Sequence, residues 1–173
     1  MPSPPLPLYL AIKAPRHKQD QIDRQRRALG ISDDYAVERL HTTLGPLGLE
    51  KDWTAPMLQG LKTALAGIQT APFYIEFDRI DGNRLVGGKA LRAVRAFRRG
   101  MAQRIAQSGL ILPTYRFNPH VTLAYGSQSD RQVAIEPIGW TVEEFLLIRS
   151  GHGRHDPLES WPLIQRQLTL PFL

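Results

Sequence analysis

Residues 40–45 read Leu-His-Thr-Thr-Leu-Gly, and residues 120–123 read His-Val-Thr-Leu. Both stretches fit the pattern H-x-T-L, and their histidines stand 79 positions apart in a chain of 173 residues. Because Thr, Val and Leu favour strands, we predict motif strands near residues 37–44 and 118–124. Alternate residues of a strand share a face, so each strand presents an imidazole beside a threonine hydroxyl. One motif in each half of the chain suggests two related lobes.

The rest of the chain alternates between strand and helix patterns. Apolar alternation and apolar runs predict strands over residues 6–13, 73–78, 84–86, 133–138, 142–148 and 161–170. Helical spacing predicts helices over residues 18–29, 54–67 and 89–107. We expect Gly30 to end the first helix, Thr54 to cap the second, and the Gly-Pro-Leu-Gly stretch at 45–48 to break the first motif strand. The outer surface of the third helix is basic, which a solvated face explains more simply than RNA contact.

The composition limits the class of protein. A length of 173 residues with 42% hydrophobic residues suits a packed interior, so we expect residues 1–173 to form a single domain. The formal net charge of +6, from 22 Lys and Arg against 16 Asp and Glu, favours polyanionic partners such as nucleic acid. The absence of cysteine excludes thiolate nucleophiles and cysteine-ligated zinc. The sequence has no apolar run of membrane-spanning length and no secretory signal, so we expect a cytoplasmic protein with no membrane partner.

The two motifs supply the groups that in-line attack on a phosphodiester requires. The attacking water must lose a proton and the leaving ribose oxygen must gain one, and two imidazoles with pKa values of about 6.5 can divide these tasks. We expect His41 and His120 to be these imidazoles, and Thr43 and Thr122 to donate hydrogen bonds to the phosphoryl oxygens as negative charge develops. The scheme needs no metal ion and no cofactor. One H-x-T-L stretch alone is most simply an ordinary strand sequence, but two copies in separate halves favour a catalytic role.

The sequence resembles the 2H phosphoesterase superfamily, and within it the RNA 2′,3′-cyclic phosphodiesterases, historically called 2′-5′ RNA ligases. The similarity covers most of the chain and rests on residues 8–12, 40–45, 117–124, 145–150 and 161–163. It implies an α+β fold of two pseudo-symmetric lobes, each an antiparallel sheet with helices packed outside, and a catalytic cleft between the sheets. It also implies hydrolysis of RNA 2′,3′-cyclic phosphate ends to 2′-phosphomonoesters, with His41 as proton donor and His120 as proton acceptor. A reverse 2′-5′ ligase reaction stays open.

Two positions depart from the pattern of that family. Tyr125 follows the second motif where relatives often have Arg, and Arg39 stands two positions before the first histidine where Asn is common. Two arginines are therefore candidates for binding the phosphate, Arg39 and Arg149. We place Arg39 on the same strand face as the first histidine. For each arginine, the alternative is a solvated side chain at a strand edge. Tyr9, Phe117 and Tyr125 are candidates for stacking on a terminal base, with a core or rim position as the alternative for each.

Other substrates and another class of function also fit the sequence. The same pair of histidines suits a small cyclic phosphate or a 2′-5′ linkage, and the basic surface suits a non-enzymatic RNA-binding module. We expect RNA ends or nucleotide cyclic phosphates as partners, and a monomer. Residues 152–155, His-Gly-Arg-His, resemble a metal or anion loop but lack a helix that would align the histidines, so we interpret them as a flexible hairpin loop.

Overall fold

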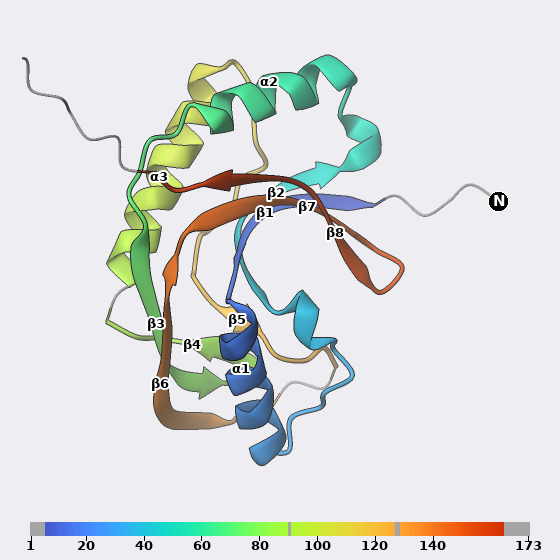
Figure 1. Cartoon of the computed structure of the whole chain (residues 1–173). Coiled ribbons are helices and arrows are strands. Elements are labelled where there is room, and N and C mark those ends of the chain that lie inside the picture. Colours follow the sequence, from blue (N-terminus) through green and yellow to red (C-terminus); the bar gives the residue numbers. More distant parts are fainter. Residues whose placement is uncertain (1–5, 90, 127–128, 165–173) are drawn as a thin grey trace, which may run out of the picture.

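The computed structural model describes residues 6–89, 91–126 and 129–164, which form two four-stranded sheets and three α-helices (Figure 1). The strands are β1 (Pro7–Lys13), β2 (His41–Leu49), β3 (Phe73–Asp81), β4 (Arg84–Val86), β5 (Val121–Thr122), β6 (Gln132–Val142), β7 (Glu144–Gly151) and β8 (Arg154–Pro162). The helices are α1 (Arg16–Ala28), α2 (Ala55–Ala66) and α3 (Leu91–Gln107), with two 3₁₀ turns, η1 (Val37–Arg39) and η2 (Glu50–Asp52). The strand orders are β2-β1-β7-β8 and β5-β4-β3-β6, and every neighbouring pair is antiparallel. The predicted α+β fold with two lobes is confirmed.

The helices form where apolar side chains recur every three or four residues. α3 packs on β3 through five buried side chains, those of Leu91, Val94, Phe97, Met101 and Ile105. α2 packs on α3 and β8, while α1 packs on β6. The predicted caps are also confirmed, because the hydroxyl of Thr54 accepts a hydrogen bond from the backbone N–H of Met57 at 3.3 Å and Gly30 follows α1 with a φ of +66°. One cluster of buried apolar side chains draws on both sheets.

Each of the two motif strands lies at an edge of its own sheet. β2 is one of the two outer strands of the first sheet, and β5 is one of the two outer strands of the second. These two edges contact each other. The fold therefore brings together two motifs that are distant in the sequence.

The first motif strand differs from its prediction at both ends. Residues 37–39 form the turn η1, and β2 begins only at His41. The strand then continues through the Gly-Pro-Leu-Gly stretch to Leu49, where the sequence predicts a break. An edge strand tolerates Pro46 because the backbone on one side of the strand has no neighbouring strand to bond. The register between β1 and β2 shifts beside Tyr9 and Leu10, opposite the Gly-Pro-Leu-Gly stretch.

The second motif strand is shorter than the predicted strand over residues 118–124. β5 has only two residues, Val121 and Thr122, and His120 stands immediately before it. Because β5 pairs only with the three-residue strand β4, its ladder has few backbone partners. The last predicted strand, over residues 161–170, is also displaced, since β8 begins at Arg154 and ends at Pro162; residues 165–170 lie outside the described part of the chain.

Candidate active site

His41 is held at the first position of β2 by hydrogen bonds to both ring nitrogens. Nδ1 lies 2.6 Å from the carbonyl oxygen of Arg39, and Nε2 lies 3.1 Å from the hydroxyl of Thr43. A carbonyl oxygen only accepts, so the neutral ring carries its proton on Nδ1 and has its lone pair on Nε2. The hydroxyl of Thr43 then donates to Nε2. This arrangement confirms that His41 and Thr43 point to one face of the strand.

His120 repeats the backbone contact of His41 in the other lobe. Its Nδ1 lies 2.8 Å from the carbonyl oxygen of Asn118, again two residues earlier in the chain. The same reasoning places the proton of the neutral ring on Nδ1 and the lone pair on Nε2. Thr122 follows on β5, opposite Arg84 of β4. The two motifs thus present imidazoles of the same tautomer from two strand edges that contact each other.

A pocket of about 430 Å³ opens beside the first motif. Its wall includes His41 and Thr43 from β2, together with four further polar or aromatic side chains, those of Tyr9, Arg39, Tyr125 and His155. A second pocket, of about 610 Å³, opens beside the second motif and is lined in part by Thr122. Tyr125 borders both pockets, and its side chain is 71% exposed. The exposed phenol ring therefore lies between the pocket beside the first motif and the pocket beside the second.

Burial and neighbouring positive charges favour the neutral form of His41. Burial is the main cause that lowers the pKa of His41 to about 4; the charges of Lys13, His120 and Arg39 act in the same direction, and the hydrogen bond to the Arg39 carbonyl opposes them. A ring with this pKa is almost entirely neutral at pH 7.

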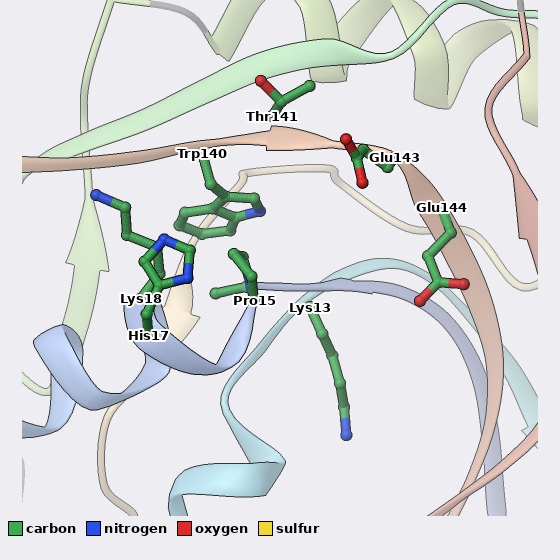
Figure 2. A pocket seen from close by; sticks show the side chains of 9 residues that line it. Lys13, Pro15, His17, Lys18, Trp140, Thr141, Glu143 and Glu144 are labelled. Carbon is green, nitrogen blue, oxygen red and sulfur yellow. The ribbon is translucent and has the colours of Figure 1, made fainter.

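Lys13 contributes to this field although no sequence pattern marks it. The backbone of Lys13 pairs with that of His41 across β1 and β2, and its Nζ donates a hydrogen bond to the carbonyl oxygen of Glu38 at 2.7 Å. Lys13 also borders another pocket, of about 420 Å³, at the start of α1. Figure 2 shows its side chain pointing away from Trp140 and His17 in that pocket. Its charge acts on His41.

The two candidate phosphate-binding arginines have different surroundings in the structure. Arg39 lines the pocket from η1, its guanidinium carbon lies 4.6 Å from the ring centre of Tyr35, and its Nε is buried without a hydrogen-bond partner among the described residues. Arg39 precedes β2, so the predicted shared strand face is wrong although the residue reaches the pocket. The Nε of Arg149 likewise lacks a partner among the described residues, but its terminal nitrogens pair with Glu50 at 3.2 Å and Asp156 at 3.4 Å.

The three candidate stacking residues have different surroundings. Tyr9 stacks on His41 with ring centres 5.0 Å apart and an interplanar angle of 21°, so one face of its ring is already covered. Phe117 packs partly buried against the core and does not line the pocket beside His41. Tyr125 meets Tyr35 edge to face at 5.2 Å and is otherwise open. Of the three, only Tyr125 is both exposed and at the pocket.

His155 is a pocket residue that the sequence prediction placed in a flexible hairpin loop. It belongs to β8, opposite Ser150 of β7, and its ring packs against those of Tyr9 and His41. The hairpin turn comprises only the two residues before Arg154. Among the described residues, no group of three or more His, Asp or Glu side chains is arranged to hold a metal ion.

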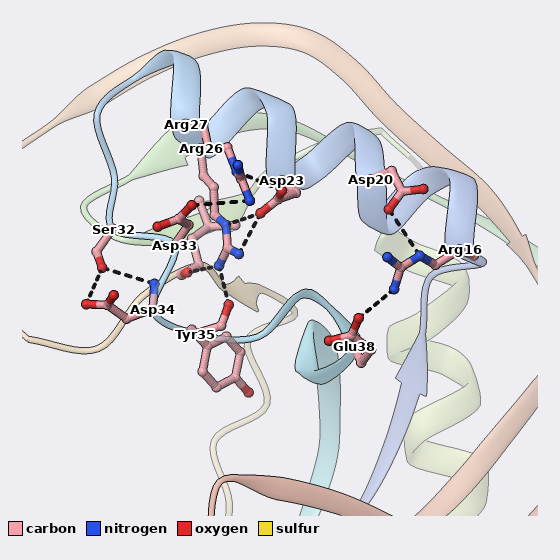
Figure 3. A network of polar contacts seen from close by, with 11 residues as sticks. Arg16, Asp20, Asp23, Arg26, Arg27, Ser32, Asp33, Asp34, Tyr35 and Glu38 are labelled. Atoms are coloured by element: carbon pink, nitrogen blue, oxygen red, sulfur yellow. Dashed lines mark hydrogen bonds and ion pairs between the residues drawn. The ribbon is translucent and has the colours of Figure 1, made fainter.

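Arg26 of α1 is a second residue that sequence reasoning missed, and it is 1% exposed. Its Nη1 donates to the carbonyl oxygens of Tyr35 at 2.7 Å and Leu123 at 2.9 Å, and Asp23 balances its charge at 2.6 Å (Figure 3). Tyr35 leads into the turn before the first motif, and Leu123 ends the second motif. One buried guanidinium therefore links the segment that precedes the first motif to the end of the second motif.

Comparisons with known proteins identify a family and similar solved structures. A family model described as the 2′-5′ RNA ligase superfamily matches residues 14–154. E. coli LigT in complex with 3′-AMP matches with a TM-score of 0.72 and 25% identity, covering 94% of this chain and 100% of that chain. The apo form of E. coli LigT gives a TM-score of 0.72 and 26% identity with the same coverage. A Thermus thermophilus protein, TT0787, shares the fold, with a TM-score of 0.66, 21% identity and coverage of 93% and 100%.

A comparison with curated protein sequences finds no match. No helix among the described residues is long and apolar enough to cross a membrane.

Proposed function

Because the chain belongs to the 2′-5′ RNA ligase superfamily, we propose that it hydrolyses 2′,3′-cyclic phosphates at RNA ends to 2′-phosphomonoesters. Membership makes it a phosphodiesterase of the 2H type, and the finer choice of substrate and mechanism is our proposal. The observation that carries it is the matched pair of imidazoles, each bound through Nδ1 to the carbonyl two residues earlier. Both rings thereby keep Nε2 for proton transfer.

In the proposed reaction, water attacks phosphorus opposite the bond to the ribose 3′ oxygen. His120 accepts the proton that the water loses, and His41 donates a proton to the 3′ oxygen as the phosphorus–oxygen bond breaks. The phosphate remains on the 2′ oxygen, and the two histidines end in exchanged protonation states. Each proton transfer contributes about 100- to 10,000-fold to the rate.

This scheme requires His41 to be protonated when substrate is bound, although its low pKa favours the neutral ring. The phosphodiester brings a negative charge next to the ring, which favours the imidazolium and raises the pKa from its value of about 4. Binding also frees the hydroxyl of Thr43, because a protonated Nε2 can no longer accept its hydrogen bond at 3.1 Å. The hydroxyl can then donate to a phosphoryl oxygen.

We propose that Arg39 replaces the family's arginine after the second motif. Its guanidinium lies at the pocket wall, and the described part of the chain provides it with no carboxylate partner. Arg149 is already neutralised by two carboxylates, so it has less charge to offer a phosphate. Thr43 and Thr122 complete the set as donors to the phosphoryl oxygens.

Small nucleotides are the second candidate substrates. E. coli LigT has been solved with 3′-AMP, with phosphate and with ATP, which supports binding of single nucleotides by this fold. RNA-end specificity predicts that an oligonucleotide with a 2′,3′-cyclic phosphate outcompetes 2′,3′-cyclic AMP; equal competition supports the small cyclic phosphate.

The test is to incubate RNA bearing a 2′,3′-cyclic phosphate with the protein in EDTA and to identify the product by ³¹P NMR. We expect a 2′-phosphomonoester. A 3′-phosphomonoester would reverse the assigned leaving group, and no ring opening with RNA, cyclic mononucleotides or 2′-5′ linkages would refute the proposed function.

A further inference from the structure

A second imidazole stands next to His41 in the pocket. His155 lies in β8, and its ring centre is 5.0 Å from that of His41 at an interplanar angle of 78°. It shares the wall of the pocket with His41 and Thr43. The proposed reaction uses only the imidazoles of His41 and His120, so the place of His155 requires a separate explanation.

The Tyr9 ring connects His155 to His41. The phenol oxygen of Tyr9 is hydrogen-bonded to Nε2 of His155 at 3.0 Å, and the phenol ring stacks on His41 with centres 5.0 Å apart. Tyr9 also meets the His155 ring edge to face at 5.7 Å. The three rings thus form a closed cluster in which each contacts the other two.

This cluster covers the side of His41 that its hydrogen bonds leave open. The bonds to the Arg39 carbonyl and the Thr43 hydroxyl fix the edge of the ring, but both depend on the ring staying in one plane. Tyr9 lies against a face of that plane, and His155 packs against the ring at a steep angle. Burial lowers the pKa of His155 to about 3, so it contributes a neutral ring at pH 7.

We propose that His155 is a positioning residue for the reaction, which holds Tyr9 through a hydrogen bond and thereby fixes the imidazole of His41 in its catalytic orientation. The inference rests on the proposed function, because it assigns His155 an effect on turnover. A displacement of a catalytic group by about 1 Å lowers rates by about 100-fold, so even a partial loss of orientation is measurable.

Two substitutions remove the hydrogen bond from opposite ends and keep the rings. His155→Phe and Tyr9→Phe are each expected to lower kcat about 10-fold and to change KM less than about 3-fold, because the orientation of an acid matters in the transition state. The double variant is expected to be no slower than the slower single variant, since both changes break the same Tyr9–His155 hydrogen bond. His152→Asn is the matched control: His152 is exposed in the same hairpin at a φ of 49°, which Asn tolerates, and its kcat should equal that of the wild type.

A kcat for His155→Phe within twofold of the wild type would overturn the proposal, and so would losses that multiply in the double variant. A rise in KM with unchanged kcat would also overturn it, since His155 would then bind substrate directly.

A second readout needs no turnover and separates this inference from the proposed function. In ¹⁵N-histidine spectra, the Nδ1 proton of His41 should exchange with water at least about 5-fold faster in either single variant than in the wild type. Unchanged exchange overturns the proposal even if the wild type opens cyclic phosphates. Faster exchange supports it even if the true substrate is another phosphodiester.

Discussion

Replacing Arg26 by Met is expected to lower the free energy of unfolding by about 3 kcal/mol. The substitution removes the donor from two buried carbonyl oxygens, those of Tyr35 at 2.7 Å and Leu123 at 2.9 Å. Each buried acceptor left without a partner costs about 1–3 kcal/mol. Met nearly conserves the volume and needs no desolvation of a charge, which offsets part of that loss. For a chain of this length, about 3 kcal/mol corresponds to a melting temperature lower by roughly 6–12 °C.

The control for this prediction is Arg27→Met on the same helix. Arg27 also pairs with Asp23, at 2.9 Å, but its side chain is 62% exposed and Arg26 is 1% exposed. An exposed pair contributes about 0–1 kcal/mol, so Arg27→Met should unfold close to the wild type. Both variants and the wild type are compared by urea unfolding followed by circular dichroism. Equal losses in the two variants would refute the reasoning, because the buried carbonyls would then carry no special cost.

Three further predictions concern the pocket. Thr43→Val and Thr122→Val should each lower kcat by about 10- to 100-fold with little change in KM, because the hydroxyls act on developing charge; steady-state kinetics showing only a higher KM would contradict this. Arg39→Gln should raise KM about 10-fold and weaken the dependence of KM on salt concentration, and an unchanged salt dependence would exclude Arg39 as the phosphate-binding cation. The pKa of His41 is about 4 in the folded protein and about 6.5 in the unfolded chain. Between these pH values the unfolded chain binds more protons, so the free energy of unfolding must fall as the pH falls from 6.5 to 4. At pH 5 the titration of His41 lowers the free energy of unfolding by about 2 kcal/mol. In urea unfolding, the decrease in this free energy between pH 7 and pH 5 should therefore be smaller by that amount for His41→Asn than for the wild type.

The sequence predicts the parts of this fold that depend on local periodicity. The buried face of α3, the cap at Thr54 and the turn at Gly30 follow from the spacing and type of nearby residues, and the structure confirms each of them. The motif histidines also follow from local pattern, because an H-x-T-L stretch places the imidazole and hydroxyl of one strand together wherever that strand lies.

The elements that the sequence mispredicts depend on neighbours that are distant in the chain. Pro46 and its flanking glycines suggest a turn, yet they continue β2 because β1 lies alongside and the other side of the strand is an edge. The second motif strand is short because its partner, β4, has only three residues. Neither fact can be read from the motif itself.

The missed site residues are explained in the same way. Arg26 contacts a carbonyl 97 positions away, and backbone acceptors leave no mark in the sequence of the residues that carry them. His155 reaches Tyr9 from 146 positions away through the pairing of β7 with β8 and β1. A histidine at the start of a strand, next to a glycine turn, has the same local pattern whether it faces solvent or a catalytic pocket.

The central claim is that His41 and His120 share one metal-independent reaction. The most direct measurement is the single-turnover rate of ring opening of a 2′,3′-cyclic phosphate in EDTA and H₂¹⁸O, for the wild type, His41→Ala and His120→Ala. We expect one ¹⁸O in a 2′-phosphate product, a loss of at least about 100-fold in each variant, and unfolding curves that show both variants folded. If either folded variant keeps more than about a tenth of the wild-type rate, the two imidazoles do not form the acid–base pair.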